Sequence, residues 1–266
     1  MTAEEGMYDM EYIRVTDDNI EKEHICCAIS NNKDVQVSSK KTWLKERFED
    51  GLVFLKSVER GKCFIEYIPA ENAWIPIDAD NYMYIDCFWV SGSFKGHGYA
   101  NDLMDECIRD AKEKGKAGLC VLSSEKKKPF LSDPGYLKYK GFEVTDRSDT
   151  GIWLMTLRWD ESAELPQFKP EARHPKINEE GYVLYYSDQC PFNAKYVPIL
   201  ESAAADNGIK FRAIHIDTKE QAQSLPCPCT TYAFFHDGEF ITNEEFSEKK
   251  FLKMALGESG RTKNEA

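Results

Sequence analysis

The stretch IDCFWVSGSFKGHGYANDLMDECI, residues 85–108, decides the fold of the first half of the chain. A run of β-branched and aromatic residues ending at Val90 predicts a strand, and a glycine-containing turn follows it. From Tyr99 onwards, apolar residues recur at helical spacing and predict a helix that packs on a sheet. Gly96 and Gly98 let successive backbone N–H groups approach an anion, which the helix dipole also favours. The turn is therefore either a pyrophosphate-binding site or a tight turn that needs two glycines.

The charge around this turn differs from that of the whole chain. The 266 residues include 34 Lys and Arg and 46 Asp and Glu, so the formal net charge is −12. Residues 91–140, in contrast, carry ten Lys and Arg against seven Asp and Glu. This local excess indicates a polyanionic cofactor such as coenzyme A, with a solvated helix face as the alternative. The negative total argues against nucleic acid and anionic membranes as partners.

Composition and termini predict a soluble globular protein of the cytoplasm. Hydrophobic residues make up 42% of the chain and aromatic residues 12%, which is ample material for a packed core. The start MTAEEGMYDM lacks the basic and apolar regions of a signal peptide, and no later apolar run is long enough to span a membrane. Nine cysteines, of which Cys26 and Cys27 are adjacent, favour buried reduced thiols over a disulfide framework.

The chain divides into two parts of mixed α/β structure. Residues 1–159 form the first domain, 160–180 a Pro/Glu-rich linker or wrap-around segment, and 181–266 a smaller α/β domain. In the second domain the element order is β-α-β and then β-β-α. In the first domain we expect strands at Tyr12–Val15, Leu52–Val58, Cys63–Ile68, Tyr82–Val90 and Gly118–Ser123, and helices at Asp17–Ser30, Ser39–Glu49 and from Tyr99.

The strand, turn and helix at residues 85–108 resemble the acyl-CoA-binding segment of the GNAT superfamily of N-acetyltransferases. That segment reads Gln/Arg-x-x-Gly-x-Gly/Ala; Gly96 and Gly98 match it, whereas Ser93 stands in place of Gln/Arg. The segment YLKYKGFEV, Tyr136–Val144, resembles the Gly-Phe signature of the same family. The resemblance covers about residues 10–159 and implies the GNAT acyl-CoA N-acyltransferase fold.

The resemblance also implies a co-substrate and the residues that hold it. Acetyl-CoA would lie in a splay between strands Tyr82–Val90 and Gly118–Ser123, and its acetyl group would pass directly to the primary amine of a small molecule or amino acid. Main-chain groups of Phe88 and Val90 would pair with the pantetheine. The pyrophosphate would be held by the amides of Lys95, Gly96, His97, Gly98, Tyr99 and Ala100.

Two side chains are candidates for proton transfer. An alkyl amine is protonated at neutral pH, so its attack needs a base, and Asp86 is the first candidate, with Glu66 as the second. The alternative for Asp86 is a half-buried carboxylate with structural hydrogen bonds. In the family, a tyrosine protonates the leaving thiolate; Leu137 holds its usual place here, so the acid is Tyr136, is replaced by water, or is absent.

The second domain carries a single thiol at a place that resembles the active site of thioredoxin-fold proteins. In SDQCPFNAKYVP, Cys190 takes the first cysteine place of CxxC and Asn193 the second. A helix N-terminus lowers the pKa of a thiol, which predicts thiolate character for Cys190. Cys227 and Cys229, in the loop that faces this thiol, would be a disulfide partner or a soft-metal site. The alternative is a redox-inert domain for packing or recognition.

Taken together, the two parts resemble the YoaP-type bacterial acetyltransferases: a GNAT domain followed by a thioredoxin-like domain. The predicted function is an acetyl-CoA-dependent N-acetyltransferase with a small-molecule amine as partner and no resident metal. Two alternatives are a thiol-redox or soft-metal sensor, in which the GNAT domain only binds CoA, and a non-catalytic interaction protein. A homodimer is compatible with the sequence.

Overall fold

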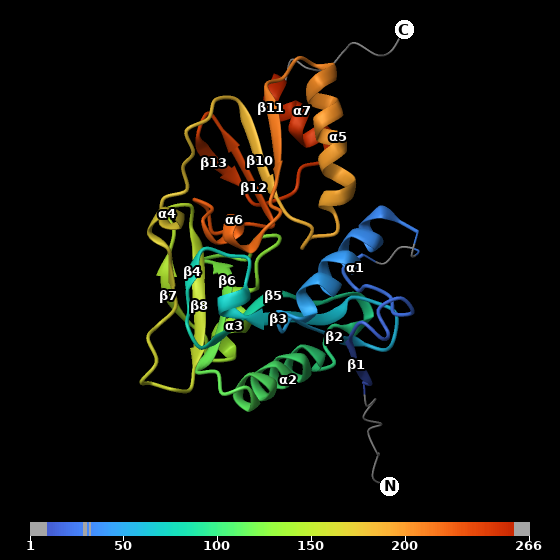
Figure 1. Ribbon diagram of the computed structural model, residues 1–266, viewed down its shortest axis with the longest axis vertical. Helices are drawn as coiled ribbons and strands as arrows, with labels where there is room; N and C mark the ends of the chain where they lie inside the picture. The colour runs from blue at the N-terminus through green and yellow to red at the C-terminus, as the bar shows by residue number, and fades with distance from the viewer. Residues whose placement is uncertain (1–9, 29–30, 32, 258–266) are drawn as a thin grey trace.

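The computed structural model describes residues 10–28, 31 and 33–257. Its described residues form two larger sheets, one from each half of the chain, and a two-stranded sheet of β4 (Ile77–Asp78) and β9 (Gln167–Phe168); the second larger sheet lies above the first in Figure 1. The first sheet has seven strands in the order β1-β2-β3-β5-β6-β8-β7. These strands are β1 (Tyr12–Val15), β2 (Val53–Ser57), β3 (Cys63–Pro69), β5 (Tyr82–Val90), β6 (Gly118–Ser124), β7 (Glu143–Arg147) and β8 (Ile152–Arg158).

One pairing in this sheet is parallel, between β5 and β6, and the other pairings are antiparallel. A parallel pair needs a crossover, and the helix α2 (Tyr99–Glu113) provides it. The turn at Gly96 and Gly98 is therefore held between the end of β5 and the start of α2. This placement confirms the strand, turn and helix that the sequence predicts here.

Helices cover both faces of the first sheet (Figure 1). Side chains alternate between the faces, so that in β2 Val53 and Leu55 join one core and Phe54 joins the other. The core of Val53 and Leu55 also contains apolar side chains of α2 and α3 (Pro134–Tyr139). The core of Phe54 contains those of α1 (Val35–Phe48).

The second sheet has four strands in the order β11-β10-β12-β13. Strands β10 and β11 are parallel, whereas β12 is antiparallel to both β10 and β13. This order confirms the predicted β-α-β followed by β-β-α. The elements are β10 (Tyr182–Tyr186), α5 (Asn193–Asp206), β11 (Phe211–His215), α6 (Lys219–Gln223), β12 (Tyr232–His236), β13 (Glu239–Thr242) and α7 (Glu248–Leu256).

The two faces of the second sheet have different partners. One face packs against α5 and α7, where Leu184 and Phe234 share a core with Val197 and Phe251. The other face, which includes Phe235, belongs to the same core as α1 and the first sheet. The two halves of the chain are therefore joined by buried apolar contacts.

The segment between the two sheets wraps around the first sheet. Its strand β9 (Gln167–Phe168) pairs with β4 (Ile77–Asp78), and the short helix α4 (Pro170–Arg173) follows. Phe168 is buried, and the Nε atom of Arg173 lies 2.9 Å from the carboxylate of Asp146 on β7. Of the two predicted forms, linker or wrap-around segment, the second is the one observed. The boundaries 1–159, 160–180 and 181–266 stay a proposal.

The predicted helix at Asp17–Ser30 is wrong over its described residues, 17–28, which form turns and bends; residues 29 and 30 lie outside the described residues. The reason is that Ile25, Cys26, Cys27 and Ala28 are buried one after another. Four consecutive buried side chains cannot lie on one face of a helix. The next helix, α1, begins at Val35 instead of Ser39 because the Asp34 side chain caps it by accepting from the Gln36 amide.

Two short 3-10 helices complete the structure, at Ala70–Asn72 and Gly92–Phe94. The second of them belongs to the turn between β5 and α2. Among the described residues, no helix combines the length and the apolar character needed to cross a bilayer.

Candidate active site

The strands β5 and β6 separate at the point where the sequence predicts a splay. Their pairing runs from Tyr82 opposite Gly118 to Ile85 opposite Val121 and stops there, although β5 continues to Val90. On the other side of β5, Cys87 pairs with Glu66 and Ile85 with Tyr67, which leaves Asp86 as the extra residue of a bulge. A bulge bends and twists its strand, and this accounts for the divergence. The edge of β5 from residue 86 to 90 is thus left without a strand partner on the β6 side, within the part of the chain described.

Five consecutive amides follow in the turn. Gly96 and Gly98 have φ values of 84° and 85°, in the left-handed region that favours glycine. Within the described ranges, the N–H groups from Gly96 to Ala100 donate to no protein acceptor. The amide of Lys95 differs, because it donates to the Gly92 carbonyl at 3.3 Å; its predicted role at the pyrophosphate stays a prediction.

A cavity of about 360 Å³ lies beside these amides. It brings together six of the eight residues predicted to bind the cofactor, and Tyr136 as well; Phe94, Asn101 and Tyr139 also line it and were not predicted. The six are Val90, Lys95, Gly96, Gly98, Tyr99 and Ala100. The other two lie next to this group: Phe88 packs on Tyr136 with 5.5 Å between ring centroids, and the exposed His97 stacks on Tyr99 at 5.5 Å.

Tyr136 projects from α3 towards the first turn of α2. Its hydroxyl donates to the Ala100 carbonyl at 2.8 Å and lies 3.3 Å from the Asn101 side-chain oxygen. Burial, together with the negative charge of Asp105, raises the pKa of Tyr136. The hydroxyl is therefore protonated at neutral pH, and it lies at the turn that holds the free amides.

Asp86, the candidate base, is half-buried on the bulge of β5. Its Oδ1 atom accepts a hydrogen bond of 3.1 Å from the side-chain amide of Gln189, which belongs to the loop between β10 and α5. Burial raises the pKa of Asp86 well above its ordinary value, and the negative charge of Glu66 adds to this effect. A raised pKa makes the ionised Asp86 carboxylate a stronger base than an exposed aspartate.

Glu66, the second candidate base, is fully buried in an ion pair. The Nζ atom of Lys40 lies 2.7 Å from each of its carboxylate oxygens. Burial alone would lower the pKa of Lys40, but the charge of Glu66 raises it above its ordinary value. Because its carboxylate is engaged by Lys40, Glu66 is structural, and Asp86 stays the candidate base.

Lys40 also donates to the backbone carbonyl of Gln189 at 2.8 Å. The buried ion pair of the first half is thus bonded to the loop of the second half. Sequence reasoning missed both Lys40 and Gln189, because the only signal for Lys40 was its place on an amphipathic helix, and Gln189 carried no signal beyond its place next to Cys190.

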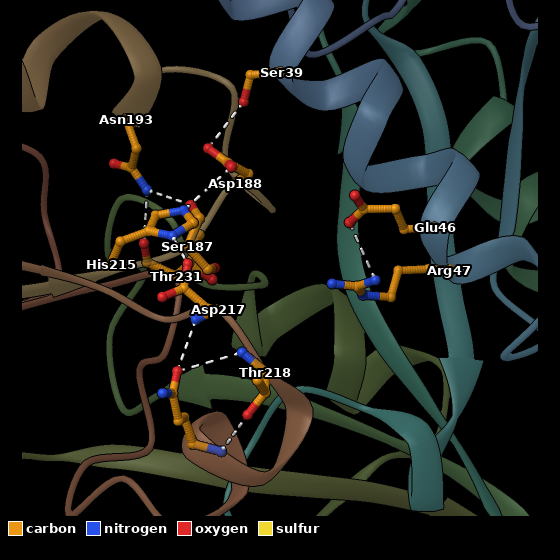
Figure 2. Close-up of polar contacts among 11 residues, drawn as sticks. Ser39, Glu46, Arg47, Ser187, Asp188, Asn193, His215, Asp217, Thr218 and Thr231 are labelled. Carbon is orange, nitrogen blue, oxygen red and sulfur yellow. Dashed lines mark hydrogen bonds and ion pairs between the residues drawn. The ribbon is translucent and has the colours of Figure 1, made fainter.

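The loop between β10 and α5 is held by polar contacts on both sides (Figure 2). Asp188 accepts from the Ser39 hydroxyl at 2.9 Å and lies 3.1 Å from Nε2 of His215. Asn193, in the second cysteine place of the predicted CxxC motif, donates to the carbonyls of Ser187 and Thr231 at 2.9 and 2.7 Å. Asn193, which replaces the second cysteine of the motif, thus holds the loop in place through its side-chain amide.

The thiol predictions are not supported by the contacts. The Cys190 thiol donates to a Glu245 carboxylate oxygen at 3.0 Å. Burial, and then the negative charge of Glu245, raises the pKa of Cys190 well above its ordinary value, which favours the neutral thiol over the predicted thiolate. Burial also raises the pKa of Glu245, to about 7.

Cys227 and Cys229 contact each other instead of Cys190. Both are buried, and the Cys229 amide donates to the Cys227 sulfur at 3.4 Å. All described cysteines are free, and the described residues contain no group of three or more side chains that could hold a metal ion. The predicted meeting of the three thiols in a soft-metal site is therefore wrong.

Comparisons with known proteins agree with this geometry. The model of the acetyltransferase (GNAT) family matches residues 18–128, and the YoaP-like family model matches residues 210–253. The chain is 44% identical over 246 residues to a Bacillus subtilis (strain 168) protein described as an uncharacterized N-acetyltransferase, YoaP; the match covers 92% of this chain and 98% of that protein. The chain belongs to the GNAT acetyltransferase family. It is an N-acetyltransferase with a YoaP-like part at its C-terminal side.

Solved structures of the GNAT family show a more distant similarity. The Escherichia coli N-acetyltransferase YhbS, solved with CoA, has 14% identity and a TM-score of 0.41; the match covers 60% of this chain and 89% of that one. A GNAT acetyltransferase of Brucella melitensis, solved with acetyl-CoA, has 15% identity and a TM-score of 0.38, over 60% of this chain and 93% of that one. In both cases the match covers little more than half of this chain.

Proposed function

We propose that the protein transfers the acetyl group of acetyl-CoA directly to the primary amine of a small molecule or amino acid. The observation that carries this proposal is the run of five free amides, from Gly96 to Ala100, beside a strand whose edge is open. Gly96, His97 and Gly98 are exposed, so their N–H groups are open to a ligand, and free amides at a helix N-terminus favour an anion. Family membership supports the same co-substrate.

The turn has room for such a group. A Cβ atom added at Gly96 or Gly98 would meet no other atom within 4 Å, so no side chain fills the bend. The five amides would face the pyrophosphate, and the open edge of β5 at Phe88 and Val90 would pair with the pantetheine. When bound, acetyl-CoA supplies an activated thioester at this edge.

On the acceptor side, Asp86 takes the proton that an ammonium group must lose before the nitrogen can attack. The neutral amine then forms the C–N bond of the amide while the C–S bond breaks. The nitrogen releases its second proton to water, the leaving sulfur takes a proton from the Tyr136 hydroxyl or from water, and water restores the proton of Tyr136. A backbone N–H on the open edge of β5 near Phe88 would stabilise the charge that develops on the carbonyl oxygen.

The test is a thiol-release assay with acetyl-CoA and a panel of small primary amines and amino acids, together with calorimetric titration of acetyl-CoA. We expect binding and turnover with at least one amine, and we expect Asp86→Asn to lower kcat by about 10²-fold or more with unchanged affinity for acetyl-CoA. Absence of acetyl-CoA binding at millimolar concentration would overturn the proposal. Full activity of Asp86→Asn would remove Asp86 from the mechanism and leave the transferase activity standing.

A further inference from the structure

The β10–α5 loop (residues 187–192) brings one side chain of the second half against the candidate base. Gln189 is buried, with 8% of its surface exposed, and its side-chain amide donates to Asp86 across a separation of 103 residues in sequence. Within the part of the chain that the structure describes, no other side-chain hydrogen bond reaches Asp86.

The backbone of Gln189 is fixed independently of this bond. Its carbonyl accepts from Lys40, whose ammonium is buried and paired with Glu66. The neighbouring Asp188 accepts from Ser39 on α1 (Figure 2). Two residues of α1 thus anchor the loop on the side that carries Gln189, so the side-chain amide has little freedom to turn away from Asp86.

The charged and titratable groups around Asp86 come from three other elements as well as from β5 itself. They are Lys40 and Arg47 on α1, Glu66 on β3, Tyr84 and Cys87 on β5, and Cys120 on β6. Lys40 is already engaged by Glu66, and Arg47 is stacked on Trp43 and Trp74 at 4.5 and 4.1 Å. The hydrogen bond to the Asp86 carboxylate comes from Gln189, which is neutral and does not titrate.

We propose that Gln189 is a positioning residue of the acetyl-acceptor site: the second half of the chain supplies the hydrogen bond that orients the Asp86 carboxylate and favours its ionised form. This inference rests on the proposed function of Asp86 as the base. It assigns the YoaP-like half a direct part in the acceptor site, beyond a packing role.

The hydrogen bond of Gln189 could also serve only to hold the two halves together. Gln223 provides a matched control for this alternative. Gln223 also lies in the second half, and its side-chain amide donates to the carbonyls of Glu71 and Ala73 at 3.2 and 2.9 Å. Its side chain joins the halves without contacting a titratable group, and the Lys169 ammonium contacts only the Gln223 backbone carbonyl, at 3.1 Å. Gln189→Met and Gln223→Met each remove a side-chain amide that donates hydrogen bonds across the interface between the halves. Only Gln189→Met removes a donor to Asp86.

The experiment has two readouts. The first is the pH profile of kcat/KM for the best amine of the panel. The second is the titration of the Asp86 carboxyl by ¹³C NMR in aspartate-labelled protein, assigned with Asp86→Asn, and it needs no turnover. Loss of a donor to a carboxylate raises its pKa, so we expect Gln189→Met to move the acid limb of the profile and the NMR midpoint upward by about one pH unit.

We expect kcat to fall about tenfold in Gln189→Met at the wild-type optimum, with unchanged KM for acetyl-CoA, and neither readout to move in Gln223→Met. Thermal unfolding of both variants checks that the fold is kept. If Gln189→Met does not fold, Gln189→Leu serves, because it also removes the amide donor and adds no charge beside Asp86.

An unchanged Asp86 midpoint in the Gln189 variant, or an equal shift in Gln223→Met, would overturn the inference. If the wild-type protein acetylates no amine, the proposed function fails, and the NMR midpoint still decides whether Gln189 controls Asp86. If Asp86→Asn stays fully active, the role of Asp86 fails and the positioning role of Gln189 falls with it.

Discussion

At the scale of single residues, the donor side of the site depends on backbone conformation more than on side chains. The five free amides need a chain path that only glycine adopts without strain at positions 96 and 98. The surrounding side chains are exposed or line the cavity wall. Substitution of a glycine therefore tests the site more directly than substitution of Lys95 or His97.

Gly98→Ala places a Cβ at a φ of 85°, and we expect the KM for acetyl-CoA to rise about tenfold because the amides after residue 98 turn away from the anion. The control is Gly115→Ala at the other end of α2, with a φ of 70° and equally open surroundings. Both variants should lose about 1–2 kcal/mol of unfolding free energy. An equal rise in KM for both would contradict the role of the turn. Steady-state kinetics and urea unfolding measure the two effects.

Lys40→Met leaves the buried Glu66 carboxylate without its partner, and we expect the free energy of unfolding to fall by about 3–5 kcal/mol. Lys45→Met is the matched control, because Lys45 lies on the same helix and pairs with Glu21 at an exposed position. Its loss should stay below about 1 kcal/mol. Urea unfolding measures both variants, and similar losses would show that the Lys40–Glu66 pair is not desolvated.

At the scale of elements, the sequence predicts the strands well and the connections less well. Tyr12–Val15 and Tyr82–Val90 have the predicted bounds, because β-branched and aromatic residues between flanking turn residues define both. The segment at residues 17–28 contains helix-like spacing but buries four neighbours in a row, a feature that depends on the packing around it. Local periodicity cannot reveal such packing.

The β10–α5 loop shows that local sequence also fails to predict the chemical environment of a residue. The place of Cys190 before a helix predicts a thiolate, but the Glu245 carboxylate that accepts from this thiol is 55 positions away in sequence. The bond between Gln189 and Asp86 joins the halves over a longer separation still. The donor side of the site is local and could be predicted; the acceptor side is assembled by the tertiary structure and could not.

The environment of Cys190 allows a prediction of how fast its thiol is alkylated. Burial and Glu245 raise the pKa of Cys190, so at pH 7 we expect its alkylation by iodoacetamide to be slower than in the unfolded chain. The rate should increase with rising pH, and at pH 7 it should increase in Glu245→Gln, by about tenfold for each pKa unit removed. Mass spectrometry of the peptide that contains Cys190 measures it. Faster alkylation in the folded protein would restore the thiolate interpretation.

At the scale of the whole molecule, one apolar core joins the two sheets. Phe235 on β12 belongs to the core that also contains Phe54 and α1, whereas its neighbour Phe234 belongs to the core under α5 and α7. The face that would be solvent-exposed in an isolated second sheet is therefore buried by the first half of the chain.

We expect a single calorimetric unfolding transition for the full chain, because separation of the halves would expose this shared core. Phe234→Ala and Phe235→Ala should each lower the free energy of unfolding by about 3–5 kcal/mol, since both side chains are fully buried. Two resolved transitions, with Phe234→Ala moving only one of them, would instead show independent domains.

The bonds from α1 to the β10–α5 loop also set an order of events during translation. Lys40, Glu66 and Asp86 all leave the ribosome more than a hundred residues before Gln189 does. A nascent chain that ends before this loop carries the turn of residues 96–100 and the proposed base, but Asp86 lacks the amide that holds it. The acceptor side of the proposed site is therefore completed only in the last third of synthesis, when the second half also covers the core that it shares with the first.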